Sequence, residues 1–378
     1  MLRTRAFSVL AFILSFLPST LRIEAEERTS SSSTPHHLLY VAVPGIRDDV
    51  QYGGTGILVF DIDHDHQFVR RIPVPALGDE KHKQPVKGIC ANATTGRLYV
   101  STIKTLSCLD LASDKVLWEK TYPSGCDRMS ITPDGKAIFE PTLEGQYWHV
   151  IDPTSGEEIA KITTGAGAHN TICGLDGKHV YLAGLKSPVL AVADAGTYAV
   201  DLNVGPFAAP IRPFTVNRQG TLAYVCVNNL LGFEIGDLVS GKKLYRVEVK
   251  DFPVGPTERH GCPSHGIGLT PDEKELWLCD AHNSRMHVFD NTVMPPKQGT
   301  SIKLREQPGW ITFSLDGRYA YPSTGDVIEV ATKKIVTGLK DERGRDVESE
   351  KLLEIDFNGD KPERAGDQFG LGRVTQSQ

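Results

Sequence analysis

The chain has 378 residues, of which 40% are hydrophobic and 23% charged, with 36 glycines and 23 prolines. This length exceeds what one hydrophobic core usually spans, and the many turn-forming residues favour short strands over long helices. The formal net charge of −6 argues against nucleic acid or an anionic membrane as partner, since both attract basic proteins.

The first 25 residues have the pattern of a secretory signal peptide. Arg3 and Arg5 precede an apolar run from Ala6 to Leu17, and Ala25 ends a plausible cleavage zone. The run is shorter than the roughly 20 residues that a membrane-spanning helix needs. Residues 26–37 are rich in serine and have the composition of a flexible leader. We therefore expect export to the periplasm or the extracellular space, with no membrane insertion after cleavage.

A turn followed by an alternating strand recurs along the chain. In the clearest example, Thr132-Pro133-Asp134-Gly135 leads into Ala137-Ile138-Phe139. One residue marks each of these turns, at intervals of 39 to 53 residues: Gly96, Gly135, Gly177, Gly220, Glu273 and Gly317. A unit of about 40 residues without helical periodicity is typical of a four-stranded propeller blade. The widest interval predicts a loop insertion at residues 251–261.

The N-terminal stretch supplies a seventh unit that lacks an innermost strand. A further strand pattern, at residues 351–357, follows the last complete unit. We predict that this strand completes the first blade and closes the ring, because closure removes two exposed sheet edges. The expected fold is all-β, a seven-bladed β-propeller over residues 38–357, followed by a C-terminal tail, residues 358–378. Little order is expected in the tail, except for docking of residues 367–370 on the first blade.

The best-formed unit, from Thr132 to Glu157, resembles the YVTN family of β-propeller repeats. Proteins of that family occur in bacterial surface layers and in the periplasm. The likeness extends over residues 39–339 and implies a propeller of the cell envelope, without implying a ligand. No Trp-Asp dipeptide ends a strand, so the chain is WD40-like in its blade length but does not meet the WD40 sequence pattern.

Candidate binding residues follow from the repeat, because the innermost strands of all blades start at one mouth of the central channel. Counting back from the marker residues gives Asp127, His169, Arg212, His265 and Gly309, and one residue further back in the first full unit gives Lys87. Loops between second and third strands open on the same face and add Asp280 and His282. The predicted binding residues are Lys87, Asp127, His169, Arg212, His265, Asp280 and His282. Water-filled propeller channels are also lined by polar residues, so a purely solvated channel stays an alternative.

Metal-ligating residue types are densest in the sixth unit. His260, Cys262 and His265 are followed by Asp280 and His282, a spacing that matches no established metal signature. No cofactor is predicted, and a divalent metal is left open. The seven cysteines are an odd number in strand-like segments, which indicates small buried side chains, with one or two disulfides left open.

Two classes of function remain. The first is a non-catalytic binding or scaffold propeller of the cell envelope, monomeric, whose partner is a protein, peptide or glycan. The second is a hydrolase acting on a small lactone or ester, with His169, His265 and Asp280 as reacting groups; it rests on fold analogy alone. A sequon, Asn92-Ala93-Thr94, adds an N-glycosylation candidate.

Overall fold

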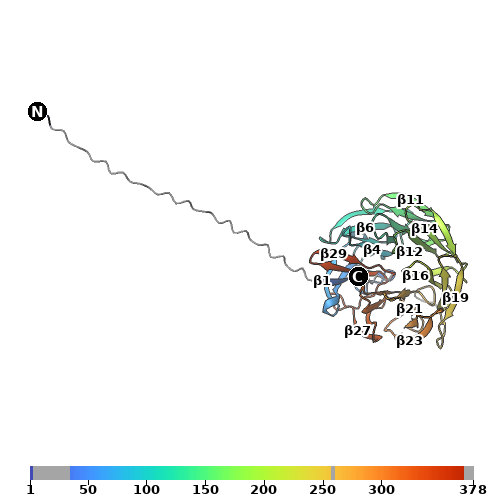
Figure 1. Ribbon diagram of the computed structural model, residues 1–378. Coiled ribbons are helices and arrows are strands. Elements are labelled where there is room, and N and C mark those ends of the chain that lie inside the picture. The colour runs from blue at the N-terminus through green and yellow to red at the C-terminus, as the bar shows by residue number, and fades with distance from the viewer. Residues whose placement is uncertain (3–34, 257–259, 370–378) are drawn as a thin grey trace. The chain divides into compact units, whose positions relative to one another are not determined.

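Seven β-sheets, arranged as the blades of a propeller, make up the computed structural model of this chain (Figure 1). The structure describes residues 1–2, 35–256 and 260–369, so the expected signal peptide and most of the expected leader lie outside the described residues. Two short 3-10 helices, η1 (Ile62–His64) and η2 (Pro75–Leu77), follow strands of the first blade. The predicted all-β, seven-bladed architecture is confirmed.

The first blade joins both ends of the described chain, in the order β29-β28-β1-β2-β3. Its strands are β1 (Pro35–Val43), β2 (Gly56–Asp61), β3 (Gln67–Ile72), β28 (Leu352–Asn358) and β29 (Lys361–Ala365). Strand β28 runs antiparallel to β1, with Leu353 opposite Tyr40 and Ile355 opposite Leu38. The predicted closure of the ring by a C-terminal strand is therefore confirmed.

The other six blades each contain four consecutive antiparallel strands. The second and third blades consist of β4 (Gly88–Asn92), β5 (Arg97–Ser101), β6 (Thr105–Asp110), β7 (Val116–Thr121), β8 (Ser130–Ile131), β9 (Ile138–Pro141), β10 (Tyr147–Ile151) and β11 (Glu158–Thr163). The fourth and fifth consist of β12 (Ala168–Cys173), β13 (His179–Gly184), β14 (Leu190–Asp194), β15 (Val200–Val204), β16 (Ile211–Val216), β17 (Leu222–Val227), β18 (Gly232–Asp237) and β19 (Lys243–Glu248). The sixth and seventh consist of β20 (Ile267–Leu269), β21 (Glu275–Asp280), β22 (Arg285–Asp290), β23 (Lys297–Lys303), β24 (Ile311–Phe313), β25 (Tyr319–Pro322), β26 (Asp326–Glu329) and β27 (Lys334–Gly338).

The marker residues of the repeat lie in the turns between the first and second strands of the blades. All six have positive φ angles, for example 70° at Gly135 and 59° at Glu273. Glycine adopts this left-handed conformation without steric cost, which explains why it recurs there. Glu273 takes the same conformation as a non-glycine residue, so the turn geometry is kept where the sequence motif is lost.

Hydrophobic side chains from neighbouring blades pack together between the sheets. One cluster joins Cys90 and Tyr99 of the second blade to Met129 and Ile138 of the third. All seven cysteines lie among the described residues, are buried and form no disulfide, and burial raises the pKa of thiols such as Cys126 and Cys262. The cysteines therefore act as small core residues.

The segment after Phe357 is more ordered than expected. Strand β29 extends the first blade inward, and the chain then enters the channel, where the Gln368 side chain donates a hydrogen bond to the Met129 carbonyl (3.0 Å). Phe369 packs against Trp310 of the seventh blade, with ring centroids 5.5 Å apart. The expectation of docking on the first blade is thus wrong for Phe369, because the apolar pocket that accepts its ring lies inside the channel.

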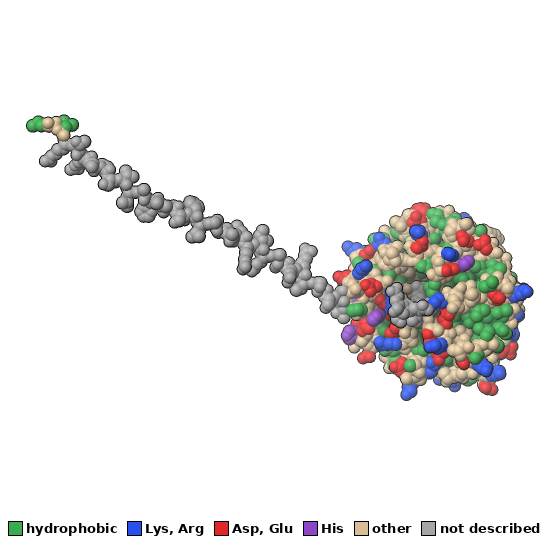
Figure 2. All heavy atoms as spheres, viewed as in Figure 1, with side chains coloured by type: hydrophobic (Ala, Val, Ile, Leu, Met, Phe, Trp, Pro, Cys, Tyr) green, Lys and Arg blue, Asp and Glu red, His purple; other side chains and the backbone are tan. Residues whose placement is uncertain are grey.

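The surface carries charges of both signs. Figure 2 shows acidic and basic side chains interspersed over the face in view, with apolar patches between them. Within the described ranges, no helix is long and apolar enough to cross a membrane.

Candidate functional site

A cavity of about 370 Å³ opens where the innermost strands of several blades start. We call it the channel-mouth cavity. Its lining residues are Ile46, Arg47, Pro85, Val86, Lys87, Ile103, Arg128, Glu144, His169, Leu185, Arg212, His260, Gly261, His265, Glu350 and Lys351. Among the described residues, the charged side chains of this lining comprise five cations, from Lys and Arg, and two carboxylates. The cavity therefore favours a negatively charged occupant.

Arg128 lies at the centre of the site and is 5% exposed. Its guanidinium donates to a carboxylate oxygen of Glu350 and, at 3.2 Å, to Nε2 of His169. The guanidinium carbon also lies 4.8 Å from the ring centroid of Trp310, a cation–π contact. Its Nε atom has no hydrogen-bond partner. Arg128 thus links three parts of the ring and is held rigidly at the cavity wall.

Glu350 and Lys351 come from the segment that leads into the closing strand β28. The Lys351 ammonium donates to Glu350 (2.8 Å) and to the Gly45 carbonyl (2.9 Å). Burial acts to raise the pKa of Glu350, but the charges of Lys351 and Arg128 hold it well below its ordinary value. Burial lowers the pKa of Lys351 to about 8 despite the neighbouring carboxylate. The closing segment therefore contributes an ionised carboxylate and a desolvated ammonium group.

His169 and Asp127 form a buried hydrogen-bonded pair, with 2.5 Å between Nδ1 and a carboxylate oxygen. Burial lowers the pKa of His169 more strongly than Asp127 raises it. Burial also acts to raise the pKa of Asp127, but His169, Lys87 and Arg128 together bring it below its usual value. The pair is therefore an ionised aspartate that orients a neutral imidazole, whose other nitrogen faces Arg128 and the cavity.

Lys87 and Arg212 are half-buried, whereas Arg47 at the rim of the cavity is exposed and Arg128 and Lys351 are buried. The Arg212 guanidinium donates to the Asn228 side chain (2.6 Å) and to the carbonyl of Gly261 (3.2 Å). Gly261 belongs to the long connection between β19 and β20, where the sequence predicted an insertion. Arg212 thereby ties this connection to the fifth blade.

Of the seven predicted binding residues, four line the channel-mouth cavity: Lys87, His169, Arg212 and His265. Asp127 lies directly behind, bonded to His169. Asp280 lies away from the cavity, where it accepts from Asn283 (2.7 Å) and pairs with Nε2 of His287 (3.0 Å) within its own blade. His282 is exposed on the neighbouring turn and does not line the cavity either. Asp280 and His282 therefore do not line the cavity, because the polar end of β21 is engaged in the blade's own hydrogen bonds.

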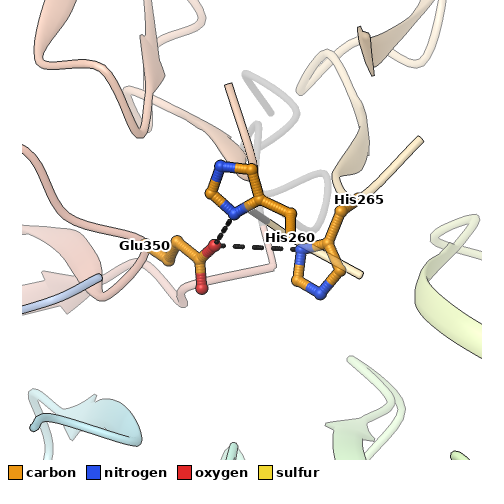
Figure 3. A group of neighbouring side chains, drawn as sticks. All are labelled: His260, His265 and Glu350. Atoms are coloured by element: carbon orange, nitrogen blue, oxygen red, sulfur yellow. Dashed lines mark ion pairs between the residues drawn. The ribbon is translucent and has the colours of Figure 1, made fainter. Parts of the chain in front are cut away.

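Three of the lining residues form a compact group of metal-ligating side chains: His260, His265 and Glu350 (Figure 3). One ligand atom of each lies within 4.8 Å of the others, and all three are buried. Cys262, the other ligand type of this loop, donates its thiol to the Ser264 carbonyl (3.0 Å). Of the metal-ligating residue types noted in the sixth unit, His260 and His265 thus lie close together, and a carboxylate from the closing segment lies beside them.

Arg128, Glu350 and Lys351 were not predicted as site residues. Arg128 follows the predicted Asp127, and neighbouring residues of an extended chain point to opposite sides, so a repeat count can miss by one. Glu350 and Lys351 precede a strand that has no marker turn after it. The sequence nevertheless contained a signal for Glu350 and Lys351. A strand that takes the place of the missing first strand of a blade starts at the same channel mouth as the first strands of the other blades.

Comparisons with known proteins support the fold and do not identify a function. No protein-family model matches the chain, and no curated protein matches it in sequence. Among solved structures, it is similar to a chain of "Kuenenia stuttgartiensis Hydrazine Synthase", with a TM-score of 0.58 and 14% sequence identity. The match covers 74% of this chain and 87% of that chain. Since many solved chains share this fold, the likeness supports the propeller architecture alone.

Proposed function

We propose that this chain is an exported binding propeller of the cell envelope, which holds an anionic group of a protein, peptide or glycan in its channel-mouth cavity. The excess of cationic over acidic side chains in the cavity supports this proposal. A buried or half-buried cation without a full complement of partners is costly, and a bound carboxylate, sulfate or phosphate relieves that cost. Arg128, with its free Nε, and the accessible Lys87 and Arg212 provide the donors.

The direct test is calorimetric titration with charged and neutral forms of the same probe. Short peptides that end in two glutamates would be compared with glutamine counterparts, and uronic-acid oligosaccharides with neutral ones. We expect Lys87→Gln and Arg212→Gln each to weaken binding of the acidic probe about 10–100-fold, since hydrogen bonds to charged groups contribute roughly 1.5–3 kcal/mol.

Lys136→Gln and Lys274→Gln are matched controls. Both lysines are exposed in the marker turns, at the opposite ends of the innermost strands from the cavity. These variants should bind like the parent. Equal affinity for acidic and neutral probes, or parent-like affinity of the cavity variants, would overturn the proposal.

Export is tested separately by expressing the full sequence and determining the N-terminus of the mature protein. Cleavage after Ala25 should leave Glu26 as the first residue. A protein that keeps Met1 and stays in the cytoplasm would refute this part of the proposal and leave the binding part unaffected.

A second candidate function, hydrolysis of a small lactone or ester, is favoured by the Asp127–His169 pair. A neutral imidazole oriented by a buried carboxylate is the arrangement of a general base, which would activate water to attack a carbonyl carbon. The water proton would pass to His169 as the water oxygen bonds to the carbonyl carbon; the tetrahedral intermediate would then expel the alkoxide, which takes that proton back from His169. His169→Gln should then lower turnover about 10²–10⁴-fold with the fold intact. If no lactone or ester is turned over by the parent protein, binding remains the function.

A further inference from the structure

We infer that His260, His265 and Glu350 bind a divalent cation of the zinc class at the wall of the channel-mouth cavity. The ligand types are those of known zinc sites with two histidines and one carboxylate, which leave a further coordination position open. The metal site stands on its own geometry. Its coupling to anions, described below, rests on the proposed function.

The contacts of His260 carry the first step. Its Nε2 atom lies 3.2 Å from the carbonyl oxygen of Gln307, which can only accept a hydrogen bond, so Nε2 carries a proton. Its Nδ1 atom lies 2.9 Å from Oε1 of Glu350. Either a proton, which makes an imidazolium–carboxylate ion pair, or a metal ion must lie between this nitrogen and the carboxylate oxygen, and the second imidazole described next favours the metal ion. A ring nitrogen whose partner N–H donates to a backbone carbonyl is the usual arrangement of a metal-binding histidine.

His265 presents a second nitrogen to the same carboxylate oxygen. Its Nδ1 atom lies 3.8 Å from Oε1 of Glu350, and both rings point toward that oxygen (Figure 3). The separations of 2.9 and 3.8 Å bracket the value of about 3.3 Å between ligands in a tetrahedron with bonds of about 2.0–2.1 Å. Nδ1 of His265 also donates a hydrogen bond to the Gly309 carbonyl (3.0 Å), so metal binding through this nitrogen requires that bond to break and the ring proton to move to Nε2.

The surroundings of Glu350 prepare its carboxylate. Arg128 and Lys351 both donate to Oε2, which leaves Oε1 to face the two imidazoles. These contacts orient the ligand as outer-shell hydrogen bonds do in metal sites. The same two cations repel a metal ion, so we expect the metal to bind more tightly when an anion occupies the open coordination position. Metal and anion would then bind cooperatively, each raising the affinity of the other by the same factor.

The test starts from the full protein treated with a chelator and dialysed. Titration with Zn²⁺, followed by calorimetry and by a rise in melting temperature, should give one ion per chain, and Co²⁺ should give the visible absorption of an imidazole-bound ion. His260→Gln should weaken Zn²⁺ binding by more than roughly 100-fold, because loss of an outer-shell partner alone costs about 10–100-fold. His282→Gln, on an exposed turn of the same blade, is the control and should bind like the parent.

Glu350→Gln serves as a second variant, because it keeps the size of the side chain and can still accept from Arg128. It should also lose the metal, and circular dichroism would verify its fold. Absence of stoichiometric binding at micromolar Zn²⁺, or parent-like binding by His260→Gln, would overturn the inference. Titrating an acidic peptide with and without Zn²⁺ separates the two proposals. Anion binding without metal binding refutes the metal site alone, whereas metal binding without anion binding refutes the proposed function alone.

Discussion

Closure of the ring predicts a large effect from a single substitution far from the site. Ile355 lies in the middle of β28, is fully buried, and packs in a cluster with Tyr40 and Ile57 of the first blade and Ile89 of the second. Replacing it by alanine removes three buried carbon atoms and leaves a cavity, which costs about 2–5 kcal/mol of unfolding free energy. In a large domain each kcal/mol of destabilisation lowers the melting temperature by at least about 2 °C, so this loss should lower it by roughly 4–10 °C.

Differential scanning calorimetry of Ile355→Ala and the parent measures this effect. Ile335→Ala on the exposed outer strand β27 is the control, and its unfolding free energy should change by no more than about 0.5 kcal/mol. A parent-like melting temperature for Ile355→Ala would show that β28 does not contribute to the stability of the ring.

Truncation after Gly344 is the stronger form of the same perturbation. It removes β28 and with it four buried apolar side chains: Leu352, Leu353, Ile355 and Phe357. At about 1.5–3 kcal/mol each, their loss amounts to roughly 6–12 kcal/mol, which is comparable to the whole stability of a typical protein. We expect an aggregating or protease-sensitive product, and a truncated chain that melts like the parent would refute closure through this strand.

Three further predictions concern buried polar side chains. His66 hydrogen-bonds Tyr321 (3.0 Å), and burial lowers the pKa of its imidazole to about 4. Between pH 6.5 and pH 4 the unfolded chain therefore binds a proton at His66 that the folded chain does not, which destabilises the fold as the pH falls. The free energy of unfolding should fall by about 2 kcal/mol from pH 7 to pH 5 in parent melting curves, and this contribution should vanish in His66→Gln. Asn92 is 5% exposed and donates to the Pro133 carbonyl (3.0 Å), so Asn92→Ala should lower the free energy of unfolding by about 1–3 kcal/mol. Because this side chain is buried, mass spectrometry of the protein secreted from a glycosylating host should find no glycan on Asn92. Asp280→Ala leaves Nε2 of the buried His287 without its partner and should cost about 1–3 kcal/mol on denaturant unfolding, without changing anion affinity.

The architecture was predictable because one conformational requirement recurs in every complete blade. A left-handed residue between the first two strands favours glycine, and glycine is visible in a sequence. The same periodicity located Lys87, His169, Arg212 and His265 at one mouth, since all innermost strands start there.

The remaining site residues depend on information that a repeat count does not contain. Asp127 and Arg128 precede the short strand β8, and which of them faces the cavity depends on how this segment packs against the fourth blade, where Arg128 forms an isolated bridge with Asn170. Asp280 fits the polar pattern equally well, but its carboxylate pairs with His287 on the adjacent strand. Sequence periodicity does not reveal such a contact between side chains. Glu350 enters the site only because two distant ends of the chain pair with each other.

The pairing of β28 with β1 determines when the channel-mouth cavity becomes complete during folding. Glu350 and Lys351 reach the cavity only after β28 has docked on β1, and β28 ends 20 residues before the end of the chain. A polypeptide in which β28 has not yet docked therefore has six complete blades of seven and an incomplete channel-mouth cavity. Cleavage of the chain just before Glu350 would take a carboxylate and an ammonium group from the cavity at once, together with the strand that closes the ring.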